Sequence, residues 1–403
     1  MTNLTLTEEQ LLLQRTARSF ARTEISPIVQ RVQKARAAGE NADPWAFCQG
    51  MFHKGWDLGF TRMLLPEVYG GNGSDMIDAA IVLEEFGAAD VAIAADLFAL
   101  NMTVPLIVAG GGNEAQKQQI LPLLTKQATV LSGALSEPNT AGSELFTQNP
   151  DPKLGIRTFA RRGGDGYIIR GQKSAFVTNC GIANYYFVLA RTSLERPLWE
   201  SISIFFVPAT TRGMLPGTRT RMSGWHTGHH AELTLDDVEV PASNLIGGEG
   251  MGMRIMSMLP QMAVGLAAAF VGLARASYEY ALDYANQRIS MGVPIIKHQA
   301  VALKLADMYC DYQTARLALW DAATGCDADL MRAATLAAPL AKTCAVDAAT
   351  RNAERALQIL GAYGVTEEYP TASWLADAWV GYACDFTRDM LRLGMIPFLP
   401  NSK

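Results

Sequence analysis

The chain has 403 residues, of which 49% are hydrophobic and 18% are charged. A chain of this kind can bury a large core, and its length suggests two or three domains, which excludes a disordered chain or a small disulfide-stapled protein. The formal net charge is −5, and no run of Lys and Arg is longer than the pair Arg161–Arg162. We therefore expect small molecules rather than nucleic acids as partners.

The cysteines and histidines give no sign of a metal site. The six cysteines are scattered without a Cys-x-x-Cys pair, and no Cys or Glu ligand spacing follows the pair His229–His230. Residues 1–10 lack the features of a secretory signal, and the most apolar run, Ala263–Ala274, is too short to span a bilayer. These features predict a cytoplasmic protein with reduced thiols and no membrane span.

The first part of the chain, residues 1–126, is predicted to form a helical domain. Thr7 and Gln10 form a capping-box pattern at the start of a helix that we expect Pro27 to end. Further helices are expected over Ile77–Phe86, Asn113–Leu124 and the Ala-rich Asp90–Val108. Pro105 predicts a break within Asp90–Val108.

Two further blocks follow, so the expected fold class is α+β. Residues 127–243 form the predicted β-domain, in which short β-type runs lie between Gly, Asn and Pro residues. Residues 244–403 form the predicted C-terminal four-helix bundle, joined by short connections. The expected strands are Gly166–Arg170, Tyr185–Ala190, Ile202–Val207 and Glu232–Leu235. The expected long helices are Met251–Arg288, Lys297–Gly325, Leu330–Gly361 and Ser373–Leu393.

Several short motifs carry the functional signal. Ser136–Ser143, with the sequence Ser-Glu-Pro-Asn-Thr-Ala-Gly-Ser, is either a plain turn or a polar loop that meets a ligand ring or phosphate. The sequence Phe-Val-Thr-Asn follows at 176–179. The bundle then contributes Arg288–Gly292, His298-Gln299 and Gln358–Gly364.

In this order and spacing, the motifs resemble those of the acyl-CoA dehydrogenase family over essentially the whole chain. The resemblance implies an N-terminal helical domain, a central β-domain and a C-terminal four-helix bundle. It also implies a homotetramer that binds FAD between the β-domain and the bundle, with a neighbouring subunit completing each site.

The resemblance also assigns roles to individual residues. Ser136 and Thr178 are expected beside the flavin ring, and Phe176 is expected to cover the ring where many members carry Trp. Ser143 is expected beside the acyl-CoA. The residues expected to bind other parts of FAD are Arg288, Gln299, Gln358, Gly361 and Thr387; Arg suits the diphosphate charge, Gln offers a donor and an acceptor, and Gly permits close approach.

In the family reaction a carboxylate removes the acidic α-proton of a thioester while the β-hydrogen leaves to the flavin as hydride. The usual Glu-Gly-Thr that supplies this base reads Asp385-Phe386-Thr387 here. Asp is shorter by one methylene, roughly 1.5 Å, and such a shortfall can penalise proton transfer. Related enzymes with Asp at this position act on alicyclic acyl-CoAs or nitroalkanes. The alternative is that Asp385 is a solvated helix residue of an inactive member.

Two further features have open interpretations. Asp96 stands in the apolar stretch Ala92–Leu100, near the far end of the acyl pocket in the family. It is either part of the substrate site or a structural carboxylate that pairs with an unseen Lys or Arg. His226 and His230 either contact CoA or are surface-loop residues.

We therefore expect FAD-dependent α,β-dehydrogenation of an acyl-CoA with a branched, alicyclic or otherwise non-linear acyl group. The expected electron acceptor is an external protein such as an electron-transfer flavoprotein. One alternative is a flavin oxidase or monooxygenase on the same scaffold, similar to nitroalkane oxidase. Another is a catalytically silent subunit of a hetero-oligomer.

Overall fold

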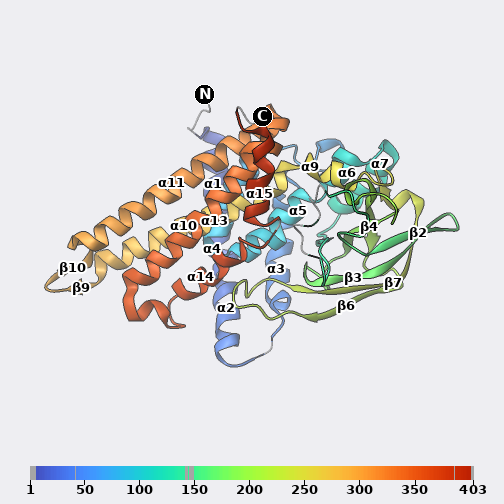
Figure 1. Cartoon of the computed structure of the whole chain (residues 1–403). Helices are drawn as coiled ribbons and strands as arrows, with labels where there is room; N and C mark the ends of the chain where they lie inside the picture. The colour runs from blue at the N-terminus through green and yellow to red at the C-terminus, as the bar shows by residue number, and fades with distance from the viewer. Residues whose placement is uncertain (1–5, 41, 141–143, 145–148, 385, 401–403) are drawn as a thin grey trace.

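The computed structural model of the protein describes residues 6–40, 42–140, 144, 149–384 and 386–400. In Figure 1 the sheet lies on one side of the molecule and the long C-terminal helices lie on the other, with N-terminal helices between them. The chain order of helices, sheet and helices confirms the predicted α+β class. The residue boundaries proposed for the three domains stay predictions.

Two capping boxes begin helices in the N-terminal domain. At the first, Thr7 Oγ1 accepts the Gln10 N–H at 3.2 Å, and Gln10 Oε1 accepts the Thr7 N–H at 3.1 Å, which confirms the predicted helix start. Asn113 and Gln116 repeat this arrangement. The longer helices here are α1 (Glu8–Phe20), α2 (Ser26–Ala37), α3 (Pro44–Asp57), α4 (Met76–Ala89) and α7 (Glu114–Thr125).

Pro27 does not end the first helix, so that prediction is wrong. The helix continues from α1 through a π-helical turn, Ala21–Ile25, and Pro27 lies at the start of α2. A π turn shifts the hydrogen-bond register by one residue, and proline is tolerated where a helical segment restarts. The Ser26 N–H and hydroxyl both donate to the Ala21 carbonyl across this turn.

Pro105 breaks the apolar helical stretch as predicted. A π-helical turn, Ile93–Ala99, leads into α5 (Leu100–Thr103), and α6 (Leu106–Gly111) follows the proline. By length and composition Ile93–Gly111 could cross a membrane, but 78% of its apolar window is buried inside the protein. That burial is typical of a core helix.

The β-domain is an eight-stranded sheet in which seven strands follow the order β6-β7-β3-β2-β4-β5-β8 and β1 pairs in parallel with β4. The four predicted strands are confirmed as β3, β4, β5 and β7. The sequence did not reveal β2 or β6, because β2 contains two arginines and β6 contains Pro and Gly. The strands are β1 (Leu131–Ala134), β2 (Phe159–Gly163), β3 (Gly166–Thr178), β4 (Tyr185–Arg191), β5 (Ile202–Pro208), β6 (Met214–Arg219), β7 (His230–Pro241) and β8 (Leu245–Ile246).

Both faces of the central strands are covered. On β4, Phe187 and Leu189 pack into the cluster that includes residues of α6, α7 and the short helix α9 (Gly252–Ser257), while Tyr186 and Val188 belong to the main core. Burial on both faces explains why β4 is a continuous apolar run rather than an alternating one.

Long helices form the C-terminal part: α10 (Pro260–Gln287), α11 (Gln299–Ala328) and α13 (Ala338–Leu360). They confirm three of the four predicted long helices, with a break before Pro260 that separates α9 from α10. The third is extended at its start by α12 (Leu330–Arg332) and a π-helical turn.

The fourth helix predicted over Ser373–Leu393 is wrong, because α14 (Thr371–Val380) and α15 (Arg388–Met395) are separate helices joined by a loop. At the start of this loop, Gly381 packs closely against α10 and α13. A Cβ on Gly381 would lie 2.7 Å from Phe270 Cζ on α10 and 2.8 Å from Val346 Cγ2 on α13. The Arg388 N–H then donates to the Tyr382 carbonyl at 3.2 Å and closes the loop.

Two consecutive buried glutamates join the N-terminal helices to the bundle. Glu84 and Glu85 on α4 share Arg275 of α10, whose Nε lies 3.3 Å from Glu84 Oε1 and whose Nη2 lies 2.8 Å from Glu85 Oε2. Arg316 Nε on α11 donates to Glu84 Oε2 at 2.9 Å, and Arg18 Nη2 on α1 donates to Glu85 Oε1 at 2.8 Å. Burial opposes ionisation of Glu85, but the two arginines outweigh it and lower the pKa of this carboxyl.

We expect Arg275→Met to lower the free energy of unfolding by about 3–5 kcal/mol, because both glutamates would lose a shared cation inside the core. Urea denaturation followed by circular dichroism measures this change. The control is Arg162→Met, which removes an exposed ion pair with Glu249 and should lower the free energy by less than about 1 kcal/mol. Equal losses for the two variants would contradict the role given to Arg275.

Candidate active site

A buried ion pair anchors the loop that follows β1. Lys173 Nζ on β3 donates to Glu137 Oε1 and to the Leu135 carbonyl, both at 3.0 Å. The Glu137 carboxylate also accepts two backbone N–H groups of the chain before β2, at 2.5 and 2.9 Å. Ser136 lies between the two anchored residues, so its position is fixed from both sides.

Burial acts on both members of this pair. It lowers the pKa of Lys173 to about 8. For Glu137 burial acts in the opposite direction, but the Lys173 charge and the accepted N–H groups outweigh it and lower the pKa. Both groups are therefore ionised at pH 7. Sequence reasoning missed this anchor, because nothing in the chain marks Lys173 as the partner of a residue on another segment.

Ser136, Phe176 and Thr178 lie at the same end of the sheet. Ser136 Oγ and Ser174 Oγ are 3.2 Å apart, the Ser174 N–H donates to the Ser136 carbonyl at 2.9 Å, and the Phe176 N–H donates to Ser174 Oγ at 3.4 Å. The Thr178 carbonyl accepts the Ser132 hydroxyl at 2.6 Å. Phe176 is 61% exposed, so its aromatic ring is open to solvent at this end of the sheet.

A second group of predicted residues lies at one end of the helical bundle. Arg288 follows α10, and its guanidinium lies 5.6 Å from the centroid of the Tyr363 ring. Gln299 begins α11, and Gln358 is exposed in the last turn of α13. Gly361 ends α13 with a φ of +63°, a value that favours glycine, and a Cβ there would meet no described residue within 4 Å other than its neighbours in the chain.

A single chain does not bring these two groups together. Between Arg288 and Gln299 the chain forms a small hairpin, β9 (Ile289–Ser290) and β10 (Val293–Pro294), and Figure 1 shows this hairpin at the end of the bundle away from the sheet. At its tip the Met291 side chain is 92% exposed.

Ser143 and Asp385 lie outside the described residues. The loop that carries position 385 is anchored on its far side, where Arg388 Nε and Nη2 each donate to the Asp347 carboxylate on α13 at 2.8 Å. The Thr387 hydroxyl accepts a backbone N–H in the first turn of α15 at 3.4 Å, so it caps this helix. A contact of Thr387 with FAD stays a prediction.

Asp96 is 3% exposed and faces the β-domain. Its Oδ2 lies 3.7 Å from His230 Nε2, and its carbonyl accepts the Asn179 side-chain amide at 2.8 Å. Burial lowers the pKa of His230 to about 4, so this ring is neutral at pH 7. The surface-loop interpretation is wrong for His230, which is buried at the start of β7 and is a described neighbour of the Asp96 carboxylate.

We expect Asp96→Ala to lower the free energy of unfolding by about 1–3 kcal/mol, because it removes the buried carboxylate that lies beside His230, where the N-terminal helices meet the β-domain. The relative rates with different acyl-CoAs should not change. Thermal melting and flavin reduction with a panel of acyl-CoAs measure the two effects, with Asp96→Asn as the variant that keeps the shape. Selective loss of activity on one acyl-CoA, at unchanged melting temperature, would instead assign Asp96 to substrate binding.

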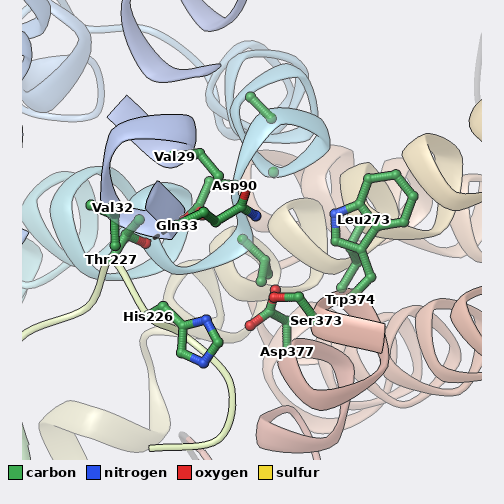
Figure 2. Close-up of a pocket in the computed structure, with 13 residues that line it drawn as sticks. Val29, Val32, Gln33, Asp90, His226, Thr227, Leu273, Ser373, Trp374 and Asp377 are labelled. Carbon is green, nitrogen blue, oxygen red and sulfur yellow. Dashed lines mark hydrogen bonds between the residues drawn. The ribbon is translucent and has the colours of Figure 1, made fainter. Parts of the chain in front are cut away.

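A separate cleft lies where α4, α14 and the chain before β7 meet. It has an empty volume of about 420 Å³, including the part open to solvent, and Figure 2 shows Asp90, Asp377, His226 and Thr227 around it. Asp90 Oδ1 accepts the Thr227 hydroxyl at 2.7 Å, and Asp377 Oδ1 accepts the backbone N–H of Trp225 at 2.5 Å. Two carboxylates from distant segments thus share one small cleft.

Both carboxyl groups hold their protons more tightly than usual. Burial, followed by the charge of Asp90, raises the pKa of Asp377 to about 7. Burial also raises the pKa of Asp90. When folding raises the pKa of an acid, the folded chain binds its proton more tightly than the unfolded chain does. The resulting stabilisation is complete at pH values below the ordinary pKa of about 4. This contribution is lost as the pH rises towards about 7, the pKa of Asp377 in the folded chain.

We expect Asp377→Asn to raise the melting temperature at pH 8 by about 2–4 °C, because the amide stays neutral and its oxygen still accepts the Trp225 N–H. The gain should shrink as the pH is lowered to 5. Differential scanning calorimetry across this range measures it, with Asp57→Asn on the exposed side of α3 as the control. A gain that is the same at both pH values would rule out the raised pKa as its cause.

Within the part of the chain that the structure describes, no group of three or more His, Cys, Asp or Glu side chains could hold a metal ion. The six cysteines are free thiols.

The chain is similar to acyl-CoA dehydrogenases along its length. Three family descriptions match it in order: the acyl-CoA dehydrogenase N-terminal domain over residues 7–128, the middle domain over 132–238 and the C-terminal domain over 248–393. An acyl-CoA dehydrogenase of Bacillus subtilis (strain 168) is 32% identical over 395 residues, which cover 98% of each chain.

Solved structures show the same similarity. Butyryl-CoA dehydrogenase from Megasphaera elsdenii has a TM-score of 0.86 at 29% identity, and the match covers 98% of this chain and 99% of that one. A glutaryl-coenzyme A dehydrogenase in complex with glutaryl-CoA has a TM-score of 0.88 at 26% identity, and the match covers 100% of this chain and 97% of that one.

Proposed function

We propose that this chain, which belongs to the acyl-CoA dehydrogenase family, dehydrogenates a branched, alicyclic or otherwise non-linear acyl group. Membership of the family makes it an FAD-dependent oxidoreductase that acts on the CH–CH group of an acyl-CoA. The observation that carries this proposal is the sequence Asp385-Phe386-Thr387 where similar enzymes carry Glu-Gly-Thr. A shorter base next to a larger side chain favours an acyl group whose α-carbon lies differently from that of a straight chain.

The residues at the end of β3 have the chemical character that a flavin ring would need. Phe176 offers an exposed aromatic face for a planar ring, and the neighbouring Ser136 and Thr178 offer hydroxyls to its polar edge. When bound, FAD supplies the acceptor for two electrons and the β-hydrogen. The buried pair of Glu137 and Lys173 keeps the Ser136 loop in place while the ring binds.

The residues for the rest of FAD come from a second copy of the chain in this proposal. Arg288 would balance the diphosphate charge, and Gln299 and Gln358 would hydrogen-bond the adenosine side. This proposal is supported by the separation of these residues from the end of β3 within one chain, and by the exposed apolar tip at Met291. A homotetramer would supply such a second copy to every site.

In the proposed mechanism Asp385 removes the α-proton of the thioester as the general base. The protein must keep this carboxylate ionised and hold it within hydrogen-bond reach of the α-carbon, because a displacement of about 1 Å can slow such a step about 100-fold. Ser143 would contact the acyl-CoA. We propose that electrons leave through an external acceptor such as an electron-transfer flavoprotein, and that the enzyme works in the cytoplasm.

We expect the purified protein to contain FAD and to lose its flavin absorbance when mixed anaerobically with a branched or alicyclic acyl-CoA, faster than with the straight-chain isomer. Asp385→Asn should keep FAD but slow this loss about 100-fold or more, because the amide cannot accept the proton. Stopped-flow spectroscopy measures both rates.

Other outcomes of the same measurements would reject the proposal. A faster reaction with straight-chain acyl-CoAs would overturn the substrate class. Oxygen uptake with nitroalkanes and no response to any acyl-CoA would identify an oxidase. A chain purified alone without FAD, which gains it only with a different subunit, would identify a silent member of a hetero-oligomer.

A further inference from the structure

One buried lysine lies against the loop between α14 and α15. Lys342 on α13 is 1% exposed, and its ammonium donates to the Cys384 carbonyl and, at 2.9 Å, to the Phe386 carbonyl. Burying an ammonium is costly unless its donors find acceptors, so these bonds tie the side chain to the loop. The residue between the two carbonyls is Asp385.

The backbone beside this position is in an unusual conformation. Phe386 has a φ of +64°, in the left-handed region that most residues other than glycine avoid, and similar enzymes carry Gly here. Such a conformation persists only where surrounding contacts hold it. The described contacts that do so include the bond from Lys342 to the Phe386 carbonyl and the packing of Phe386 against the apolar cluster that contains Met253 and Met256.

The two ends of the loop have other anchors. Tyr382 Oη donates to Asp347 Oδ1 at 3.3 Å, and Arg388 donates to both oxygens of the same carboxylate. These contacts close the base of the loop but do not reach the two carbonyls in its middle. The Lys342 ammonium supplies the described hydrogen bonds there.

We propose that Lys342 is the positioning residue of the base: its ammonium fixes the carbonyls of Cys384 and Phe386, the two residues that flank Asp385 in the sequence, and brings a positive charge to that backbone. This inference rests on the proposed role of Asp385. A short aspartate has fewer rotatable bonds than a glutamate with which to correct a misplaced backbone, so it depends more on such an anchor. A neighbouring positive charge also favours the ionised carboxylate, which is the form that accepts a proton.

The test compares Lys342→Met and Lys342→Arg with the wild-type enzyme in anaerobic flavin reduction over a range of pH. The Lys342→Met variant should still bind FAD, but its flavin should be reduced about 10- to 100-fold more slowly. The pH at which its reduction rate reaches half the maximum should be higher by about one unit. Lys342→Arg keeps the charge and should recover most of this shift in pH. Combined with Asp385→Glu, Lys342→Met should cause a smaller loss, because the longer side chain tolerates a looser backbone.

The matched control is Asn352→Ala, which removes another buried donor from α13 whose amide bonds the Ala274 and Met308 carbonyls, away from the loop. It should lower the melting temperature without moving the pH profile. If Lys342→Met also changes only the melting temperature, the inference is overturned and the proposed function stands. If the wild type and Asp385→Asn react alike, the proposed base is wrong, and the role of Lys342 is overturned with it.

Discussion

The arrangement of the whole chain depends on the two buried glutamates of α4. Glu84 and Glu85 lie where α1, α10 and α11 meet, and each bonds arginines from helices far apart in the sequence. Leaving either carboxylate unpaired inside the core would cost several kcal/mol, so these ion pairs favour the observed relative placement of the helices. The N-terminal helices are thereby fixed against the bundle, and the sheet packs beside both.

The same principle recurs on a smaller scale at the end of the sheet where we propose that the flavin binds. Glu137 and Lys173 are each buried, and each has further backbone partners, so the pair is satisfied beyond its mutual contact. A polar loop beside a cofactor would otherwise be free to move. The buried pair converts it into a fixed edge on which Ser136 is presented.

The proposed base is held differently, by a loop rather than by a helix. A continuous helix from Ser373 to Leu393 could not place one backbone carbonyl on each side of Asp385 against the same ammonium, because helical carbonyls all point along the axis. The break between α14 and α15, the left-handed Phe386 and the buried Lys342 form one arrangement. It suits a carboxylate that is one methylene shorter than the usual one.

The sequence by itself determined the order of helices, strands and helices, because apolar periodicity and capping residues such as Thr7 and Asn113 act locally. The motifs that identified the family are local in the same way, so the family could be recognised without coordinates. Only the tertiary structure decided three other features: the path of the chain past Pro27, the loop after Val380, and the partners of Lys173 and Lys342. Each depends on groups that are distant in sequence or on a backbone conformation that its own residues do not favour, and a buried charge finds its partner only when the chain is packed.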